Sequence, residues 1–338
     1  MTRPDVVQVD PSSPGLADWL DAAVDAARHE HGDVHTERSL LEWREMAGTS
    51  SDFRWVLLAA VVDGQVVGAA AARLPQLDNR HFVGGQLSVR PAWRRRGVGS
   101  ALLDAVERLA GDDGRSTVCL DADVAGDAAE RAAAGFAAAR GYELALSSAR
   151  SDLDLTSPQL WSTVQGVEDD ARGRAQDYDL VSWWDQAPAR WLEQRAALSN
   201  RMSTDIPQGD VRAEPQVWDG DRLRRMYASV AAQGRRLVET VAVHRPSGTA
   251  VAYSSMGVPV LDPAVVYQWD TLVVREHRGR RLGQLVKAAN LRTLCAEVPA
   301  ARRVVTWNAD VNEPMLRVNR ALGFTPVGQI QEWQRHLP

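Results

Sequence analysis

The chain has 338 residues, of which 45% are hydrophobic and 25% charged, and its formal net charge is −5. This length suits about two domains, the composition is that of a globular protein, and a negative charge implies no general attraction to nucleic acid or membranes. The sequence shows no apolar signal stretch and no apolar run of about 18 residues, so we expect a cytoplasmic protein without a membrane partner, either a monomer or a homodimer. Its two cysteines, Cys119 and Cys295, form neither a disulfide framework nor a metal motif, and no metal is expected.

The first half of the chain predicts an alternation of strands and helices. Asp63-Gly64 between two apolar runs is a strong hairpin signal. Periodicity predicts strands at 6–9, 55–62, 65–74, 81–90 and 117–121, helices at 14–27, 37–47 (with Thr36 as N-cap), from about Val98 and at 128–139, and last strands from Tyr142 that include Leu153 and Leu155. The polar stretch 165–177 predicts a linker.

The second half repeats this order. We expect strands at 180–183, 237–244, 249–257, 265–274 and 304–307, and helices at 188–203, 221–233, 284–295 and 315–322. Gly99 and Gly141 are 42 positions apart, and Gly283 and Gly323 are 40 apart. Agreement in both order and spacing predicts two tandem copies of one fold.

A strand, a basic glycine loop and a helix between Leu87 and Ala110 form the most informative stretch. A glycine loop that opens a helix presents unpaired N–H groups at the positive end of the helix dipole, where phosphate oxygens bind, and arginines add charge and forked donors. The candidate binding residues of this stretch are Leu87, Val89, Arg94, Arg95, Arg96, Gly97, Val98, Gly99 and Ser100.

The stretch resembles motif A of the GNAT superfamily of acetyl-CoA-dependent N-acyltransferases. Arg94, Gly97 and Gly99 match its Gln/Arg-x-x-Gly-x-Gly/Ala signature. The resemblance implies an α/β architecture with a mixed (α+β) sheet and two tandem GNAT domains, at residues 1–160 and 178–338. It also implies acetyl-CoA as co-substrate and direct attack by an amine on the thioester.

The second copy departs from this signature at one position. Its candidate residues are Val273, Arg278, Gly279, Arg280, Arg281, Leu282 and Gly283. Arg281 replaces the first glycine, which is tolerable if its φ stays negative, and its guanidinium could either contact phosphate or block the groove. Asn308 to Phe324 resembles the family segment that flanks the pantetheine arm, whereas the first copy has Glu130 at the position of Asn312. One active copy and two active copies both remain open.

The resemblance implies that a backbone N–H near Val89 or Val273 polarises the thioester carbonyl. Many members protonate the leaving thiolate with a tyrosine four residues before the Gly-Phe pair, but that position is Ala137 in the first copy and Asn319 in the second. Asn319 could donate a hydrogen bond to the sulfur but has no acidic proton. Asp270 is the candidate base of the second copy, with Asp121 and Asp123 in the first; each could instead be a solvated acid at a strand end.

These features predict an N-acetyltransferase acting on a primary amine of a small molecule or peptide. A non-catalytic acyl-CoA-binding or sensing protein is the alternative, favoured by the missing tyrosines. Transfer to oxygen, or of a longer acyl chain, is a third possibility. The sequence does not identify the acceptor.

Overall fold

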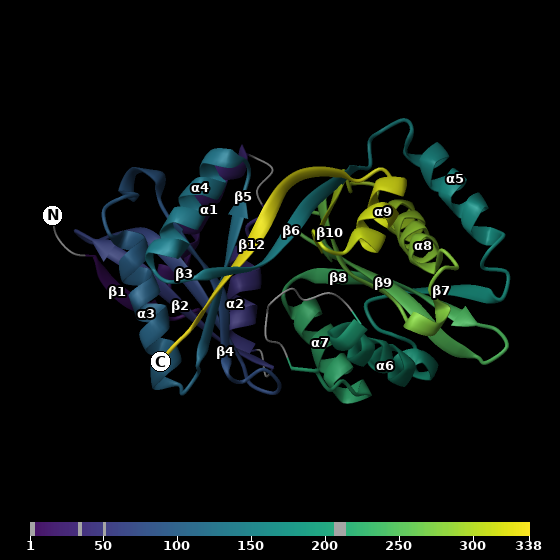
Figure 1. Cartoon of the computed structure of the whole chain (residues 1–338), viewed down its shortest axis with the longest axis horizontal. Coiled ribbons are helices and arrows are strands. Elements are labelled where there is room, and N and C mark those ends of the chain that lie inside the picture. Colours follow the sequence, from purple (N-terminus) through teal and green to yellow (C-terminus); the bar gives the residue numbers. More distant parts are fainter. Residues whose placement is uncertain (1–3, 33–35, 50–51, 206–213) are drawn as a thin grey trace. The chain divides into compact units, whose positions relative to one another are not determined.

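A computed structural model describes residues 4–32, 36–49, 52–205 and 214–338 and divides into two compact units (Figure 1). Unit 1 contains the described residues up to Ser147 and those from Gly328 to Pro338. Unit 2 contains the described residues from Ser148 to Val327. The backbone therefore passes from unit 1 to unit 2 and returns at its end.

Unit 1 is a mixed sheet with helices on both faces. In sheet order, its strands are β1 (Asp5–Val9), β2 (Phe53–Val62), β3 (Gln65–Pro75), β4 (Phe82–Val89), β5 (Thr117–Val124) and β12 (Thr325–His336). Its helices are α1 (Gly15–His31), α2 (Leu40–Thr49), α3 (Val98–Asp112) and α4 (Asp127–Ala139), with a short 3₁₀ turn, η2 (Pro91–Trp93). Strands β4 and β5 pair in parallel, whereas the pairs β1–β2, β2–β3, β3–β4 and β5–β12 are antiparallel.

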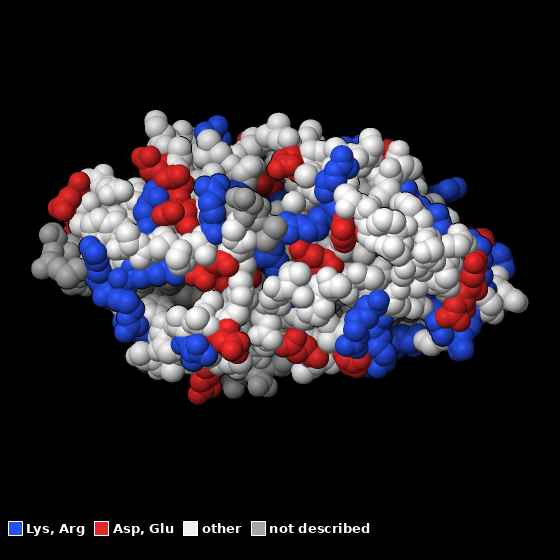
Figure 2. Space-filling model, turned by 90° about the horizontal axis from the view of Figure 1, so that it is seen from above, with Lys and Arg blue, Asp and Glu red and all other residues white. Residues whose placement is uncertain are grey.

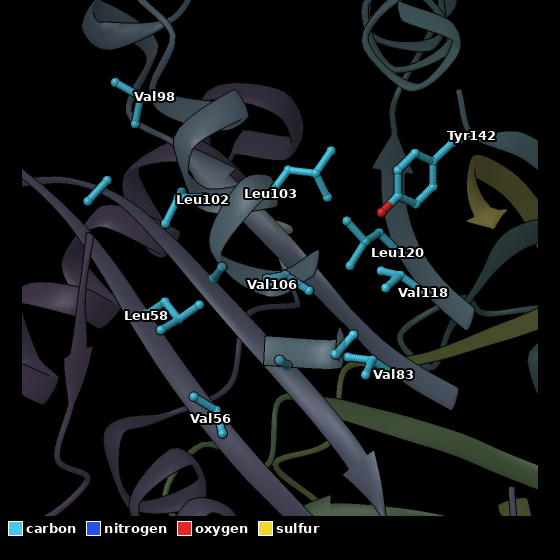
Figure 3. Packing of buried hydrophobic residues seen from close by; sticks show 14 of the residues in the cluster. Val56, Leu58, Val83, Val98, Leu102, Leu103, Val106, Val118, Leu120 and Tyr142 are labelled. Carbon is cyan, nitrogen blue, oxygen red and sulfur yellow. The ribbon is translucent and has the colours of Figure 1, made fainter. Parts of the chain in front are cut away.

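The small residues of β3 show how the two faces of this sheet are covered. Ala70 and Ala72 pack in the core beneath α3 and α4, whereas Ala69 and Ala71 face the core of α1 and α2. This alternation follows from the two-residue period of a strand. Figure 3 shows the first of these cores, with Leu102 and other apolar side chains of α3 above the sheet.

Unit 2 has the same arrangement. In sheet order, its strands are β6 (Glu143–Asp154), β11 (Arg303–Ala309), β10 (Val265–Val273), β9 (Thr249–Pro259), β8 (Arg235–His244) and β7 (Tyr178–Trp184). Its helices are α5 (Leu160–Arg172), α6 (Ala189–Asp205), α7 (Gly220–Ala232), α8 (Leu282–Glu297) and α9 (Glu313–Ala321), with the 3₁₀ turn η3 (Arg275–His277). Helices α6 and α7 cover one face, and α5, α8 and α9 cover the other (Figure 1).

Two strands belong to both units. Residues Ser148 to Asp154 of β6 pair with β11 in unit 2, and residues 329–336 of β12 pair with β5 in unit 1. The prediction that Leu153 and Leu155 belong to the last strands of the first copy is therefore wrong: Leu153 is buried in the core of unit 2, and Leu155 packs against that core. Alternation identifies a strand but not the sheet that it joins, which explains the error.

Several local predictions are confirmed and two are wrong. Asp63 and Gly64 have φ values of 49° and 80° and form the β2–β3 hairpin turn, as predicted. The cap of α2 is not Thr36 but Ser39, whose hydroxyl accepts from Glu42 N while Glu42 Oε2 accepts from Ser39 N. The expected linker at 165–177 is mostly the helix α5.

Helix α5 was missed because its apolar side chains are few. Leu160, Val164 and Ala171 are buried at helical spacing, and the polar residues between them lie on the other side. A narrow apolar stripe is enough when a helix packs on a larger core.

Figure 2 shows positive and negative side chains interspersed over the visible face, without a single large basic patch. Within the described ranges, no helix is both long and apolar enough to cross a membrane.

Candidate active site

In both units a pair of parallel strands parts just before the basic loop. Pairing between β4 and β5 runs from Phe82 to Gln86, and pairing between β10 and β11 ends at Tyr267. Beyond these points β4 and β10 stay paired only with their antiparallel neighbours, β3 and β9. Each unit therefore has a sheet that opens on one edge of the strand leading into the loop.

The backbone donors at this edge can be assigned from the ladder. Arg90 N donates to Val67 O and Val274 N donates to Val251 O, both at 3.0 Å. Because N–H groups alternate between the two edges of a strand, those of Val89 and Val273 point to the edge that the parallel neighbour has left. These are the two positions at which the family resemblance implies a backbone N–H that polarises the thioester carbonyl.

The loop of unit 1 follows its predicted form. Arg95 and Gly97 have left-handed φ values of 61° and 82°, and α3 begins at Val98 with no side chain capping its N-terminus. The first N–H groups of a helix have no intrahelical partner, so they are available to an anion.

The loop of unit 2 has the same backbone but corrects one expectation. Arg281, at the position of Gly97, has φ 58° rather than a negative φ. The side chain also forms an ion pair with Asp170 of α5. The geometry of the loop thus needs a left-handed residue here, and an arginine accepts that conformation at a cost.

This cost is measurable by comparing Arg281→Gly with Arg281→Ala. Both variants lose the ion pair with Asp170, but only glycine adopts a left-handed φ without strain. We expect the glycine variant to be more stable by about 1 kcal/mol in urea denaturation. Equal stability of the two variants would show that the loop relaxes to another conformation.

The second glycine of each loop allows close packing between helix and strand. A β-carbon at Gly99 would lie 3.7 Å from Val89 and 3.5 Å from Phe136, and one at Gly283 would lie 3.7 Å from Val273 and 3.8 Å from Val318. The same elements meet in each unit, so the two loops correspond in three dimensions as well as in sequence.

The side chains of Arg94 and Arg278 form hydrogen bonds and ion pairs within the protein. Arg94 Nε donates to Val89 O at 3.3 Å and its guanidinium pairs with Glu30 at 2.6 Å. Arg278 Nε donates to Val273 O at 3.1 Å and its guanidinium lies 3.9 Å from Asp205. These arginines tie the loop to the end of the strand. The guanidiniums of Arg95, Arg96 and Arg280 are exposed and are better placed to meet a phosphate.

Strand β10 differs from β4 in having a bulge. Its register shifts between Gln268 and Thr271, whereas β4 pairs with β3 without interruption. Asp270 lies in this bulge, is exposed to solvent, and accepts a hydrogen bond from Tyr253 OH at 3.1 Å. Although the residue keeps solvent-accessible surface, the groups packed around its carboxylate desolvate it and raise the pKa of Asp270, and the charge of Arg195 and the bond from Tyr253 partly oppose this.

A buried polar network lies behind Asp270. Arg195 stacks over the ring of Tyr253, 3.6 Å from its centre, and pairs with Glu239 at 2.8 Å. Glu239 is fully buried and also accepts from Tyr227 OH at 2.6 Å and from Trp183 Nε1 at 3.2 Å. Because its members hold each other in place, the network keeps Tyr253 in position to donate to Asp270.

Asn319 is 2% exposed and both ends of its amide are bonded. Its Oδ1 accepts from Lys287 Nζ at 2.6 Å, and its Nδ2 donates to Asn308 Oδ1 at 2.5 Å. Burial lowers the pKa of Lys287 to about 7. Sequence reasoning missed Lys287; the available signal was that it is the only lysine in the chain.

Asn312 serves as the N-cap of α9, where its side chain accepts from Met315 N at 3.4 Å. It therefore shapes the segment that the family resemblance places beside the pantetheine arm. Its predicted contact with the cofactor stays a prediction.

Unit 1 carries a pair of carboxyl groups at its parting strands. Asp121, in the last β4–β5 pair, lies opposite Glu332 of β12. Desolvation raises the pKa of Asp121 to about 6; desolvation and the charge of Asp121 raise that of Glu332 to about 7. Asp123 instead lies 3.4 Å from His31. Glu332 was missed because it is distant in sequence and comes from a strand that was not predicted.

Residues 16–142 match the Acetyltransferase (GNAT) family. Over 98% of both chains, the structure is similar to a tandem GNAT protein from the clavulanic acid biosynthesis pathway, with 27% identity and a TM-score of 0.78. It also shares its fold with a GCN5-related N-acetyltransferase from Sphaerobacter thermophilus (16% identity, 99% and 96% of the two chains, TM-score 0.64). A third similar fold is that of Saccharomyces cerevisiae N-myristoyltransferase, solved with myristoyl-CoA (9% identity, 100% and 82%, TM-score 0.58). No curated protein matches the sequence.

Proposed function

We propose that this chain is a tandem GNAT protein and that it is an N-acetyltransferase that moves the acetyl group of acetyl-CoA to a primary amine. We further propose that its two GNAT domains follow the predicted ranges 1–160 and 178–338, except that residues 148–160 belong to the second unit and residues 328–338 to the first. The observation that carries the proposal is the parting of β10 from β11 directly before an uncapped helix N-terminus, with Asp270 exposed in the adjoining bulge. Along the chain, the proposed base Asp270 is followed by the N–H of Val273 and then by the helix N-terminus that would bind the anion.

The roles follow from the chemistry of each group. The N–H groups at the start of α8 and the arginines of its loop would bind the pyrophosphate. Val273 N–H would stabilise the negative charge that develops on the thioester oxygen. Asp270 would take the proton of the attacking amine, and its raised pKa suits that task. One similar structure was solved with bound myristoyl-CoA, and another is specified as being without AcCoA. Both descriptions support an acyl-CoA donor.

The alternative of a non-catalytic acyl-CoA-binding protein is favoured by unit 1. There the position of the usual tyrosine is Ala137, β4 has no bulge, and the side chains beneath α3 are apolar. We propose that unit 2 performs the chemistry and that unit 1 binds CoA without being required to turn it over. Release of CoA thiol from acetyl-CoA with a panel of small amines and peptides tests the enzyme proposal. If none of the amines raises thiol release above the background rate, the result would favour the binding protein.

Charge at the loop position tests where CoA binds in unit 1. Gly97 has a left-handed φ, and a β-carbon there meets nothing within 4 Å, so asparagine and aspartate both fit. We expect Gly97→Asp to weaken acetyl-CoA binding by at least about tenfold, because its carboxylate would repel the pyrophosphate, and Gly97→Asn to weaken it far less. The matched pair at the second loop is Arg281→Asp and Arg281→Asn.

Calorimetric titration with acetyl-CoA measures both pairs. A variant with aspartate in one loop and asparagine in the other separates the two sites, because the binding stoichiometry then reports which unit still binds acetyl-CoA. Unchanged binding in the Gly97→Asp, Arg281→Asp double variant would place the nucleotide somewhere other than the two loops.

A further inference from the structure

The proposed reaction leaves one proton unassigned. When the C–S bond breaks, the electron pair remains on sulfur, and the thiolate of CoA must gain a proton. The residues at the position of the usual tyrosine are Ala137 and Asn319, and neither has an acidic proton. The following inference rests on the proposed function and assigns this proton.

Lys287 is the one lysine among 338 residues, and every other strongly basic side chain of the chain is arginine. It lies on α8 and is 1% exposed. Arginine does not release a proton near neutral pH, whereas a buried lysine does. Lys287 is therefore a buried cation that, unlike an arginine, can lose its proton near neutral pH.

The ammonium of Lys287 lies 5.1 Å from the ring centre of Phe324, but its hydrogen-bond donors are incompletely satisfied. It has three N–H donors, and the structure gives it one hydrogen bond, to Asn319 Oδ1 at 2.6 Å. No carboxylate in the described ranges forms an ion pair with it. A buried cation with spare donors is costly to a protein unless another group completes its environment.

The acids on the elements around α8 have other partners. In the described part of the chain, the charged and titratable groups of these elements pair with one another: Glu168 with Arg292, Asp170 with Arg281, Glu239 with Arg195, Asp270 with Tyr253, Glu313 with Arg320, and Tyr178 with His277. None of these contacts includes Lys287, and burial is the one cause that lowers its pKa.

Unit 1 provides the comparison. Lys287 follows Gly283 by four positions, as Leu103 follows Gly99, and Asn319 precedes Gly323 as Ala137 precedes Gly141. Leu103 and Ala137 are buried together in an apolar core, and Figure 3 shows Leu103 among aliphatic neighbours. The two units thus differ at both positions at once, an apolar pair in one and a hydrogen-bonded polar pair in the other.

The polar pair lies toward the parting strands. Asn308, the second partner of Asn319, is at the end of β11, beyond the last β10–β11 pair. Gln268, the first residue of β10 past that point, is 3% exposed, and its Oε1 has no partner in the described structure. Buried polar groups with unused hydrogen-bonding capacity indicate that a polar ligand completes this region.

We propose that Lys287 and Asn319 together replace the missing tyrosine of unit 2. In this scheme the amine nitrogen bonds to the carbonyl carbon and passes a proton to Asp270. The C–S bond then breaks, and the ammonium of Lys287 gives its proton to the sulfur, which produces the CoA thiol. Solvent returns the proton from Asp270 to the neutral Lys287. Asn319 holds Lys287 through Oδ1 and positions it for this transfer.

The lysine can be observed directly, because lysine labelled at Cε yields a single side-chain NMR signal from this chain. We expect its pH titration to change when CoA is added, because a sulfur beside Nζ couples its own ionisation to that of the ammonium. Desulfo-CoA, which lacks the thiol, should leave the titration nearly unchanged. Equal effects of the two ligands, or no effect of CoA, would overturn the proposal.

Kinetics separate proton donation from packing. Lys287→Met should lower kcat for acetyl-CoA by about 10²-fold with a much smaller change in KM. The deficit should shrink with an acetyl thioester of a far more acidic thiol, which leaves without a proton. Lys287→Arg keeps the charge but should stay slow. A deficit that is the same for both donors, or full activity of Lys287→Arg, would contradict the role of acid.

Restoring the family residue offers a rescue. In the Lys287→Met background, Asn319→Tyr should recover part of the lost kcat, whereas Asn319→Gln should not. If the wild-type protein acetylates no amine, the proposed function fails. The NMR comparison of CoA with desulfo-CoA then still decides whether Lys287 faces the sulfur.

Discussion

Replacing Asp270 with asparagine is expected to lower kcat for amine acetylation by about 10²–10⁴-fold while the affinity for acetyl-CoA is kept. Asparagine has the shape of aspartate and can still accept the bond from Tyr253 OH, so the bulge should keep its geometry. What is lost is the carboxylate that takes the proton of the amine. Measurement of CoA thiol release at saturating acetyl-CoA, beside a binding titration, gives the two quantities separately.

The pH dependence gives this prediction a second readout. Desolvation raises the pKa of Asp270, so the base is protonated and inactive over a wider acidic range than an ordinary aspartate. In the wild type the rate should rise as the pH increases through this raised pKa, and Asp270→Asn should lack that rise.

Asp121→Asn in unit 1 is the matched control, because Asp121 also lies at the parting of two strands. Asn319→Ala should slow turnover in unit 2 without abolishing CoA binding, since it removes the partner of Lys287. Normal turnover of both unit 2 variants together with loss of turnover in Asp121→Asn would move the chemistry to unit 1.

The second large effect concerns stability. Lys287→Met should make the protein more stable near pH 6 and lose that advantage as the pH rises toward 10. Burial lowers the pKa of Lys287 from 10.5 to about 7. Between these values the unfolded chain binds a proton that the folded chain does not, so raising the pH stabilises the wild type.

The size follows from the same pKa difference. Integrated over the window, it amounts to about 4–5 kcal/mol, since one pH unit corresponds to about 1.4 kcal/mol. Methionine removes this penalty but leaves Asn319 Oδ1 without its donor, which costs about 1–3 kcal/mol. The net gain at pH 6 is therefore about 1–4 kcal/mol, with a reversal of sign at high pH.

Urea denaturation at several pH values tests this, and the quantity of interest is the difference between variant and wild type. Leu103→Met at the corresponding position of unit 1 is the control, and its difference should not change with pH. A pH-independent difference for Lys287→Met would show that Lys287 keeps an ordinary pKa in the folded protein.

The local parts of this architecture could be predicted from the sequence. The two basic loops, the helices that begin at Val98 and Leu282, and the hairpin at Asp63-Gly64 depend on neighbouring residues, and local pattern describes them well. The position of Asp270 near the end of the strand that leads into the loop could likewise be predicted, whereas the bulge in β10 could not, and its role as a base stays a prediction.

The rest depends on contacts between distant residues. Arg281 was considered tolerable only with a negative φ, but its φ is positive because the loop, not the residue, imposes the left-handed conformation. Glu332 opposite Asp121, and Lys287 beside Asn319, join segments that only the pairing of strands and the packing of helices bring together. The hydrophobic periodicity of the sequence carries no information about such pairs of distant residues.

The return of β12 to unit 1 has a consequence for how the protein is made. Synthesis proceeds from the N-terminus, so β5 is complete long before the residues that pair with its outer edge leave the ribosome. Until then, that edge offers unpaired N–H and C=O groups to any other strand. Completion of the first unit to be synthesised thus waits for residues 328–338, and a stop before them would leave an exposed edge rather than an independent domain.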